Sequence, residues 1–300
     1  MRKQKLTEVP RPFICGVIQE EDPAAAISEI KEGENAGARV FELNLSIFPP
    51  ELHTPRALAP VFRCTALPVF TTNRRYGRNL PDDFESLRRV DDGPRMQLQL
   101  DLIDVGSAGF DMELDTYDSQ LGPSFASAEG IRYSADPTSP PRELTTDPRA
   151  IERQTHLVEE AHKRGGEILA SAHTLTRTTT DDVLRICRIA EERGCDMLKI
   201  VRFCQSWEDV SDTLAQTVAL RCQAKVPFVH MAMGEYGKIT RLMTPLLGSM
   251  LCFCKHSYPP GAFTDQPLIS AAKAVFDNVD FRIAPRAAEF TVDWYLRGSD

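Results

Sequence analysis

The chain has 300 residues, about twice the usual length of a single domain, so it holds either two domains or one large α/β barrel. Its hydrophobic content of 42% and charged content of 26% are ordinary for globular proteins and exclude a disordered or fibrous chain. Thirty-five Lys and Arg residues against 43 Asp and Glu residues give a net charge of −8, which argues against a broad nucleic-acid-binding surface.

Short apolar, β-rich runs recur along the whole chain. They begin at Pro12, Arg39, Pro68, Asp111, Glu167, Met197, Pro227 and Met250. Runs of this kind, separated by one helix and two loops, are typical of βα units with a buried parallel sheet. Eight such units predict a single (β/α)8 TIM barrel, an α/β fold, over residues 11–279; an open sheet of the same units is the alternative.

Helix signals lie between these runs. Pro23 suits the first turn of a helix. Thr180 can cap a helix that Gly194 ends. Ser206 and Asp209 have the spacing of a capping box. The crossovers are therefore expected to be helical.

One interval is too long for a simple crossover. Residues 121–146 follow the strand that carries Glu113, are rich in Gly, Pro, Ser and Thr, and lack apolar periodicity. Long loops in compact domains are either functional or disordered. We interpret this insertion as a possible lid, because it leaves a strand at the end where barrel active sites form; a disordered insertion is the alternative. Residues 280–300 are expected to form a C-terminal extension.

Location and redox state follow from the apolar runs and the cysteines. No apolar run approaches the ~20 residues that a membrane span needs, and the basic N-terminus lacks the apolar stretch of a signal peptide. The eight cysteines are therefore expected to be reduced thiols of a cytoplasmic protein. Cys252 and Cys254 have no matching second pair, so we predict that they pack rather than bind zinc.

Lys199 stands inside the apolar run that begins at Met197. A buried lysine is costly unless it becomes neutral, and a neutral amine is the form that attacks a ketone to make a Schiff base. The alternative is a structural lysine paired with a buried carboxylate. Position alone does not separate the two.

His173 ends the run before that of Lys199, so a barrel places the two side chains on adjacent strands. An imidazole beside an iminium can remove a proton from the neighbouring carbon and then protonate a leaving group. Glu113, one strand earlier, could orient His173 and hold its tautomer. Further on, Gly234 and Gly237 precede Arg241 at a predicted helix start, an arrangement that favours an anion site.

Taken together, the motifs resemble one family. The order ELNLS, PVFTTNR, DMELD, ASAHTLTRT, DMLKIV, MAMGEYGKITRL and LLGSM is similar to that of type I 3-dehydroquinate dehydratase across roughly residues 11–279. The resemblance implies a (β/α)8 Schiff-base enzyme of the shikimate pathway of aromatic amino acid biosynthesis. Such an enzyme dehydrates 3-dehydroquinate to 3-dehydroshikimate without metal or organic cofactor.

The resemblance also implies a role for each matching residue. Lys199 matches the Schiff-base lysine, His173 the general acid/base, and Glu113 the glutamate beside that histidine. Arg241 matches the arginine that binds the substrate carboxylate, and Glu42 the glutamate of the second strand. A homodimer is expected because the family often forms one.

The sequence departs from the family pattern where the substrate's hydroxyls are held. Asn44 and Ser46 replace the Arg and Asp of Glu-x-Arg-x-Asp in the second strand. Asn73 stands where the family has an arginine, and Arg74 follows one place late. The family's Ala-Pro-Gly-Gln loop is changed at residues 259–262, with Gln266 the nearest substitute.

A short cluster of arginines follows the third apolar run. Arg74, Arg75 and Arg78 are interpreted as a solvated basic loop. Because the chemical centre is kept while pocket residues change, the substrate is expected to be 3-dehydroquinate or a related carboxylated polyhydroxy cyclic ketone. Asn44, Asn73 and Gln266 are then expected near it.

We therefore predict a hydro-lyase that removes water through a Schiff base, with no metal and a small-molecule substrate as partner. One alternative is a class I aldolase-like lyase in which Lys238 and Arg241 bind a phosphate. Another is a ligand-binding regulatory protein that kept a dehydratase-like barrel after losing efficient turnover. The intact set of Glu113, His173 and Lys199 opposes the latter.

Overall fold

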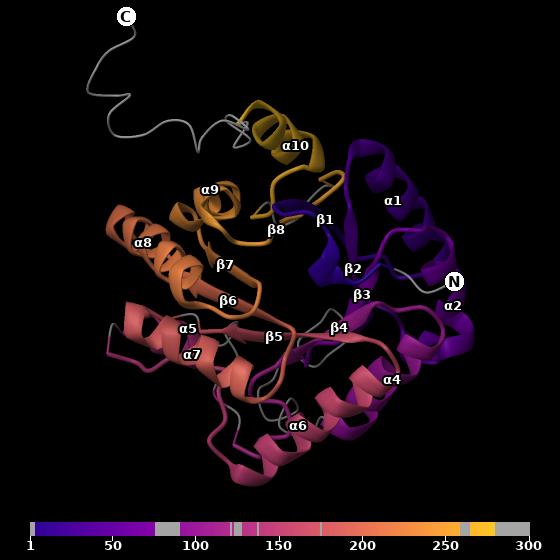
Figure 1. Ribbon diagram of the computed structural model, residues 1–300, viewed down its shortest axis with the longest axis horizontal. Helices are drawn as coiled ribbons and strands as arrows, with labels where there is room; N and C mark the ends of the chain where they lie inside the picture. Colours follow the sequence, from indigo (N-terminus) through magenta and orange to yellow (C-terminus); the bar gives the residue numbers. More distant parts are fainter. Residues whose placement is uncertain are drawn as a thin grey trace, which may run out of the picture.

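A computed structural model of the protein describes residues 4–75, 91–120, 122, 128–136, 138–174, 176–258 and 265–279. In these residues, parallel strands form a ring with helices around it (Figure 1). None of the described helices has the length and hydropathy that a membrane span requires. Arg78, the extension at 280–300 and the changed loop at 259–262 lie outside the described residues.

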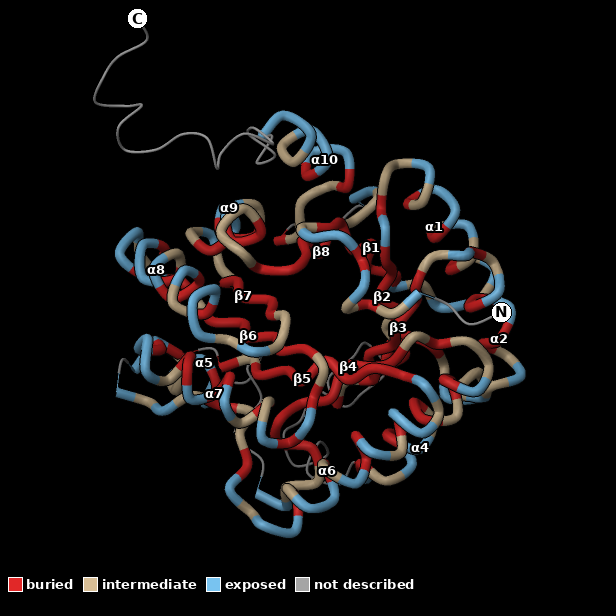
Figure 2. Tube along the Cα trace, in the orientation of Figure 1, coloured by how far each residue is buried: buried red, intermediate tan, exposed pale blue. Residues whose placement is uncertain are grey.

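Eight parallel strands make up the sheet, in the order β7-β6-β5-β4-β3-β2-β1-β8. Each predicted run overlaps one of them, and β4 begins at Gly109, two residues before the predicted start at Asp111. Their bounds are β1 Phe13–Ile18, β2 Val40–Asn44, β3 Val69–Thr72, β4 Gly109–Glu113, β5 Glu167–His173, β6 Met197–Phe203, β7 Phe228–Met233 and β8 Leu251–Cys254. Nearly every strand residue is buried, as expected for a parallel sheet that is covered on both faces (Figure 2).

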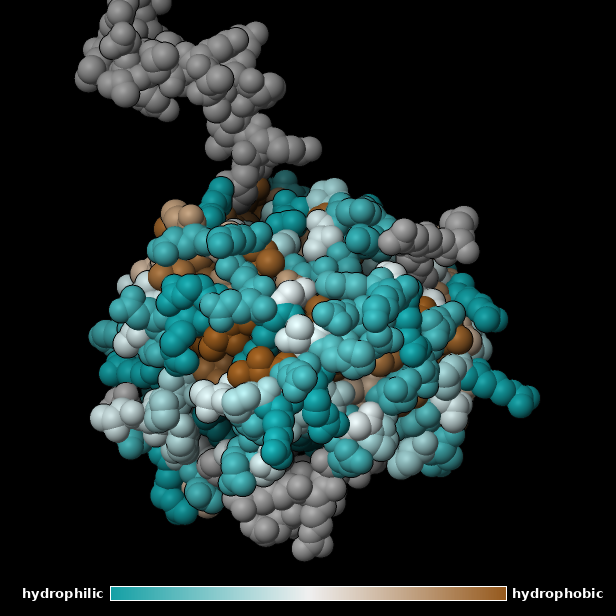
Figure 3. Space-filling model, turned by 60° about the horizontal axis from the view of Figure 1, so that its bottom comes forward, coloured by the Kyte–Doolittle hydropathy of each residue, from teal (hydrophilic) through white to brown (hydrophobic). Residues whose placement is uncertain are grey.

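Helices join successive strands and cover the outside of the ring. They are α1 Pro23–Ala36, α2 Pro55–Arg63, α4 Asp92–Asp104, α5 Ala128–Ala135, α6 Pro148–Lys163, α7 Thr180–Glu192, α8 Trp207–Gln223, α9 Thr240–Leu247 and α10 Ile269–Asn278. Short 3-10 helices are η1 Leu6–Glu8, η2 Leu45–Ile47, η3 Pro50–Leu52 and η4 Tyr236–Ile239. Figure 3 shows one face of the molecule, which is largely hydrophilic with a small recessed apolar patch.

The predicted helix ends are confirmed, with two refinements. Pro23 opens α1, and Gly194 follows the end of α7 in the left-handed region at φ 76°. The residue that caps α7 is Thr179, one place earlier than predicted. Ser206 caps α8 by accepting from the Asp209 amide, but the Asp209 carboxylate accepts from the Gln205 amide instead of completing a capping box.

The interior has an apolar base that the N-terminal segment covers. Leu6 and Val9 are buried in the same cluster as Leu169 and Met197 of the strands. The Glu167 carboxylate, at the start of β5, accepts from the Leu6 amide and from the Thr7 hydroxyl. The segment before β1 is thus held to the barrel by hydrogen bonds as well as by apolar contact.

The contact between β7 and β8 differs from the regular strand pairing found in the rest of the ring. β7 and β8 stand at the two ends of the hydrogen-bonded series. They are connected where β8 begins: the Met250 amide donates to the Phe228 carbonyl at 2.7 Å, and the His230 amide donates to the Ser249 hydroxyl at 3.1 Å. The barrel is therefore nearly closed, with a seam between β7 and β8.

The inserted segment is partly helical, and the cysteine pair of β8 lies in the core. Residues 121–146 contain the short helix α5, and the role of this stretch as a lid stays a prediction. Cys252 and Cys254 are buried with their sulfurs 3.5 Å apart, which confirms that they pack in the core.

His230, on β7, predicts a pH dependence of stability. It is fully buried with Nδ1 2.9 Å from the Thr217 hydroxyl, and burial, aided by Arg202, lowers its pKa to about 3. A folded-state pKa below the unfolded value of about 6.5 gives stability that is present above pH 6.5 and is lost as the pH falls toward 3. Between pH 6.5 and 5 this loss is about 1.6 kcal/mol. Urea unfolding of wild type and His230→Gln at both pH values should show it as a steeper decline in wild type; equal declines would contradict it.

Candidate active site

The site forms where polar residues replace apolar ones on the inner face of the barrel. Residues two apart on a strand face the same side, so Met197, Lys199 and Val201 of β6 share the interior. Met197 belongs to the apolar base, and Lys199 stands one layer nearer the carboxyl ends of the strands. Ser171 lies beside Lys199 in the register of β5 and β6, and His173 lies beside Val201.

Lys199 is paired with two buried carboxylates. Its Nζ lies 2.9 Å from Asp111 Oδ2 and 3.6 Å from Glu42 Oε1. The Phe253 ring centroid is 4.8 Å from the same nitrogen, a cation–π distance. Burial alone lowers the pKa of Lys199, but Asp111 and Glu42 outweigh it and raise the pKa above its ordinary value. The expectation that burial makes this amine neutral is therefore wrong for the free protein: its resting state is a charged ammonium.

The two carboxylates differ in their proton affinity. Burial raises the pKa of Glu42, and the attraction of Lys199 only partly offsets this. Asp111 is equally buried, but Lys199, Arg74 and a hydrogen bond from the Ser171 hydroxyl hold its pKa below the ordinary value. Of the two neighbours of Lys199, Glu42 is therefore the better acceptor for its proton.

His173 contacts a carboxylate from a distant part of the chain. Its Nδ1 lies 3.0 Å from Glu143 Oε2 and 2.9 Å from Arg74 Nη2, and its backbone amide donates to the same carboxylate oxygen at 2.7 Å. Burial and Arg74 lower the pKa of His173, against the opposing effect of Glu143. The imidazole is thus neutral near pH 7 and can act as a base.

Glu113 does not take the place predicted for it. Its Oε2 accepts from Arg95 Nη1 at 2.8 Å, and its Oε1 is 4.0 Å from Arg74 Nη2. Among the described residues, the carboxylate bonded to the His173 ring is that of Glu143. The predicted contact between Glu113 and His173 is therefore corrected, because adjacent strands fix the neighbourhood of two side chains and not their pairing.

Arg75 is buried and Arg74 keeps only 15% of its side chain exposed, so the solvated-loop interpretation of these two residues was wrong. Arg75 is 2% exposed and forms ion pairs with Asp92 and Asp115. Burial raises the pKa of Asp115 to about 6, although Arg75 opposes the shift. Arg74 joins Glu143 to the edge of the Asp111 carboxylate, at 2.9 and 3.7 Å. A continuous buried ionic network therefore surrounds Lys199 and His173.

Arg241 is buried and already has an anionic partner. Its Nη2 lies 3.1 Å from Asp265 Oδ2, its Nη1 faces the Met231 sulfur, and its buried Nε lacks a hydrogen-bond partner. The predicted helix start is confirmed, because α9 begins at Thr240, but η4 runs directly into it, so its first turn is not a free helix end. The anion site thus rests on the Arg241 guanidinium itself.

Three more residues were predicted to bind the substrate, and some of their polar groups are already used in hydrogen bonds within the protein. Asn44 at the end of β2 uses its side-chain oxygen to accept from the amide and hydroxyl of Ser46. Asn73 follows β3 and its carbonyl accepts from Arg95 Nη1. Gln266, next to Asp265, has a buried Oε1 without a hydrogen-bond partner.

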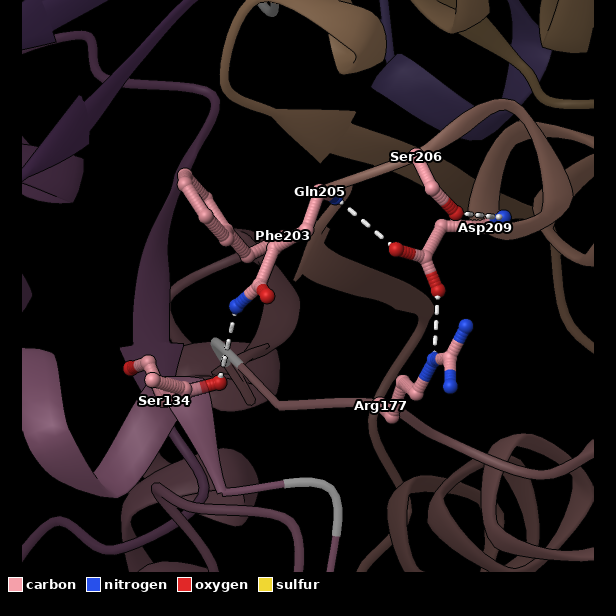
Figure 4. A pocket seen from close by; sticks show the side chains of 7 residues that line it. Ser134, Arg177, Phe203, Gln205, Ser206 and Asp209 are labelled. Carbon is pink, nitrogen blue, oxygen red and sulfur yellow. Dashed lines mark hydrogen bonds and ion pairs between the residues drawn. The ribbon is translucent and has the colours of Figure 1, made fainter.

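A cavity of about 300 Å³ lies at the carboxyl end of β6. Phe203, on the inward-facing series of Lys199, lines it together with Arg177 and Gln205 (Figure 4). The side-chain amide of Gln205 donates to the backbone carbonyl of Ser134 in α5, so the inserted segment forms one wall of the cavity. The residues that line this cavity are distinct from those that contact Lys199 and His173.

Several buried polar atoms of this network lack a hydrogen-bond partner, although some of them form longer ion pairs. They include Glu42 Oε1, Glu113 Oε1, Arg74 Nη1 and Arg241 Nε. Folded proteins rarely leave such atoms unpaired, and exceptions mark places where a ligand or water binds. The arrangement fits a polar ligand with several hydroxyl or carboxylate oxygens, and the amine, imidazole and carboxylates provide covalent and acid–base chemistry for it.

One group of possible metal ligands lies away from this network. Glu29 and Glu32 of α1 approach His256, with their ligand atoms within 4.8 Å of one another. All three are at least partly exposed. The ion-pair partners of Lys199 among the described residues are Glu42 and Asp111, not these three, and a metal-free reaction stays a prediction.

Comparison with known proteins finds a family match for the C-terminal half of the chain. Residues 142–277, which carry His173, Lys199 and Arg241, match the family model of the type I 3-dehydroquinases. This part of the chain is similar in sequence to the type I 3-dehydroquinases. The predicted resemblance is thereby confirmed.

Curated members of this family align with less than half of the chain. The 3-dehydroquinate dehydratase of Clostridium kluyveri is 32% identical over 124 residues, which are 40% of this chain and 48% of that protein. That of Syntrophotalea carbinolica is 36% identical over 100 residues, 32% of this chain and 39% of that protein. The alignments thus span about half the length of these relatives, or less.

Solved structures match the chain over most of its length. The 3-dehydroquinate dehydratase of Geobacillus kaustophilus has a TM-score of 0.67 at 19% identity and covers 92% of this chain and 95% of its own. The type I enzyme of Clostridium difficile has a TM-score of 0.68 at 20% identity and covers 92% and 97%. These likenesses establish the fold, and they confirm the (β/α)8 barrel over the open sheet.

Sequence reasoning missed Glu143, Asp265, Arg95 and Asp111 as members of the site. Asp111 lies in the motif that contains Glu113, two residues earlier on the same inner face, so strand periodicity could have found it. Glu143 and Asp265 lie in irregular segments, and neither carries a pattern in the local sequence. Only the tertiary structure brings them to His173 and Arg241.

Proposed function

We propose that the protein is a Schiff-base hydro-lyase that eliminates water from 3-dehydroquinate or a related carboxylated polyhydroxy cyclic ketone. The observation that carries the proposal is the buried Lys199 amine between Glu42 and Asp111, with His173 on the next strand. The match of residues 142–277 to the family model of the type I 3-dehydroquinases supports this choice of substrate.

Covalent bond formation begins with loss of a proton from Lys199. Glu42, whose pKa burial raises, accepts it and leaves a neutral amine beside the substrate ketone. The amine attacks the carbonyl carbon to give a carbinolamine, and protonated Glu42 returns its proton to that hydroxyl, which leaves as water and gives an iminium. The positive iminium replaces the ammonium next to Asp111, so the ion pair is kept.

Proton transfer at the neighbouring carbon falls to His173. Neutral imidazole removes the proton that the iminium has acidified, and the imidazolium then protonates the departing hydroxyl, which leaves as water. Hydrolysis of the iminium releases the enone and restores Lys199. Each proton that His173 takes is returned, so the reaction needs no metal and no organic cofactor.

Arg241 binds the carboxylate of the substrate in this proposal. In this arrangement Glu42 and Asn73 face the edge of the substrate ring that is far from its carboxylate. Gln266 lies next to Asp265. The Asn44 side chain is bonded to Ser46, so its place in substrate binding depends on release of that turn. The proposal also includes a place in the shikimate pathway, a cytoplasmic location and a homodimer.

Asp265 competes with the substrate carboxylate for Arg241. Its carboxylate lies 3.1 Å from the guanidinium, so ligand binding must displace it. Asp265→Asn should therefore lower KM about tenfold, since charge-assisted hydrogen bonds contribute roughly 1.5–3 kcal/mol and the amide competes less well. Steady-state kinetics with 3-dehydroquinate measure this effect. An unchanged or higher KM would contradict the competition.

Borohydride trapping tests the proposal directly. The protein is incubated with 3-dehydroquinate and sodium borohydride, and the reduced adduct is located by peptide mass spectrometry. 3-Dehydroshikimate formation is followed in parallel. A ligand adduct on Lys199 with product formation is the expected result. Absence of an adduct and of product with this ketone would reject 3-dehydroquinate as substrate.

A ligand-binding regulatory role is the second candidate. Asp265 on Arg241 and the local turn at Asn44 favour it, because both engage groups that the family resemblance assigns to the substrate. An adduct on Lys199 that forms without turnover would support this role over catalysis.

A further inference from the structure

Glu143 makes two contacts with the same residue. One of its carboxylate oxygens, Oε2, accepts from the His173 backbone amide at 2.7 Å and lies 3.0 Å from His173 Nδ1. The pair is almost excluded from solvent, with 11% of the Glu143 side chain exposed. The carboxylate therefore holds both the ring and the backbone at the end of β5.

The ionisation of Glu143 is fixed by its neighbours. Arg74 Nη2 donates to both of its carboxylate oxygens, at 2.9 and 3.1 Å. Burial raises the pKa of Glu143, but Arg74 and His173 outweigh burial and hold it well below the ordinary value. An ionised carboxylate only accepts hydrogen bonds, so its contact with Nδ1 requires a proton on that nitrogen.

Arg74 places a competing demand on His173. Its Nη2 is 2.9 Å from Nδ1, and a guanidinium only donates. Nδ1 cannot donate to Glu143 and accept from Arg74 at once. The ring therefore has two neutral arrangements: Nδ1–H bonded to Glu143 with Nε2 free as a base, or Nδ1 bonded to Arg74 with the proton on Nε2.

The backbone at Glu143 carries an independent sign of function. Its φ of 55° lies in the left-handed region, which of the described non-glycine residues only Tyr117 and Glu143 occupy. Such conformations cost free energy and persist where the surroundings impose them, most often at functional sites. Here the surroundings are well defined: the Thr145 amide donates to Leu114 O, and Arg193 donates to Thr145 O.

We propose that Glu143 is the positioning residue of His173: it keeps the proton on Nδ1, in competition with Arg74, and so leaves Nε2 as the base. The segment that joins β4 to α6 thereby supplies a part of the site that no strand provides. The proposal rests on the proposed function for its kinetic consequence, whereas the tautomer it assigns is a property of the free protein.

Glu143→Gln tests this assignment, because the amide keeps the size of the side chain but removes its charge. Two-dimensional NMR of ¹⁵N-histidine-labelled protein, with His173 assigned from the His173→Gln spectrum, should show the Nδ1–H tautomer in wild type. The variant should show Nε2–H, with Nδ1 accepting from Arg74. Glu113→Gln should leave the Nδ1–H tautomer in place, since Glu113 is bonded to Arg95.

Kinetics provide the second readout. Glu143→Gln should lower kcat about 10²-fold or more with KM changed less than about threefold, as expected when a catalytic histidine holds the wrong tautomer. The acid limb of the kcat/KM pH profile should move to lower pH, because the anion that favours imidazolium is gone. Glu129→Gln, on exposed α5 of the same segment, is the matched control and should behave as wild type.

The outcomes separate the two proposals. An unchanged Nδ1–H tautomer in Glu143→Gln, or an unchanged kcat and acid limb in a protein that turns over substrate, would overturn the role of Glu143. If wild type neither forms an adduct nor releases product with 3-dehydroquinate, the proposed function fails, and the NMR comparison still decides the tautomer without any substrate.

Discussion

Lys199→Arg is expected to abolish Schiff-base formation and to lower kcat at least about 10³-fold, because arginine keeps the positive charge but provides no amine that can attack a ketone. Arginine still pairs with Asp111 and Glu42, so the variant should remain folded. Borohydride trapping and 3-dehydroshikimate formation are the measurements. Normal turnover in this variant would exclude Lys199 as the covalent residue.

Lys199→Ala gives the matching stability result. It leaves Asp111 and Glu42 buried without their cation, and removing one partner of a buried ion pair costs about 3–5 kcal/mol. Its thermal midpoint should therefore fall well below that of Lys199→Arg, while both variants are inactive. If Lys199→Ala alone were inactive, its loss of activity would be attributed to misfolding.

His173→Gln is expected to lower kcat about 10²–10⁴-fold while a trapped adduct still forms on Lys199. The imidazole transfers protons only after the iminium has formed. The variant should therefore still form the covalent adduct, while elimination of water is slowed. Single-turnover trapping at several times, with product measured in the same samples, tests the order of events. His156→Gln, at an exposed position of α6, is the control and should match wild type. Product release at the wild-type rate from His173→Gln would remove His173 from the reaction.

The strands could be predicted because each carries its own signal. A parallel sheet covered on both faces requires apolar runs, and all of the predicted runs became strands. The same logic predicted burial of Lys199, since a lysine within a run such as Met197–Phe203 is enclosed whichever face of the sheet it points to. Burial of the charge was thus predictable, but its neutralising partners were not.

The pairing of charged residues could not be predicted, because it depends on contacts between distant segments. Arg75 looked like part of a solvated cluster, yet its partners Asp92 and Asp115 lie 17 and 40 residues further along the chain. Glu113 was assigned to His173 by strand order, whereas the contact belongs to Glu143, 30 residues before the histidine. Strand order sets which elements are neighbours, and side-chain length and backbone conformation decide which groups meet.

The seam between β7 and β8 has a consequence for ligand exchange. Arg241 follows β7 and Asp265 follows β8, so their ion pair ties the two sides of the seam together near the barrel mouth. A ligand that takes Arg241 from Asp265 removes this tie while the ladder at that point offers few hydrogen bonds to replace it. Binding of an anion at Arg241 would therefore exchange an ion pair across the seam for one between the protein and the ligand.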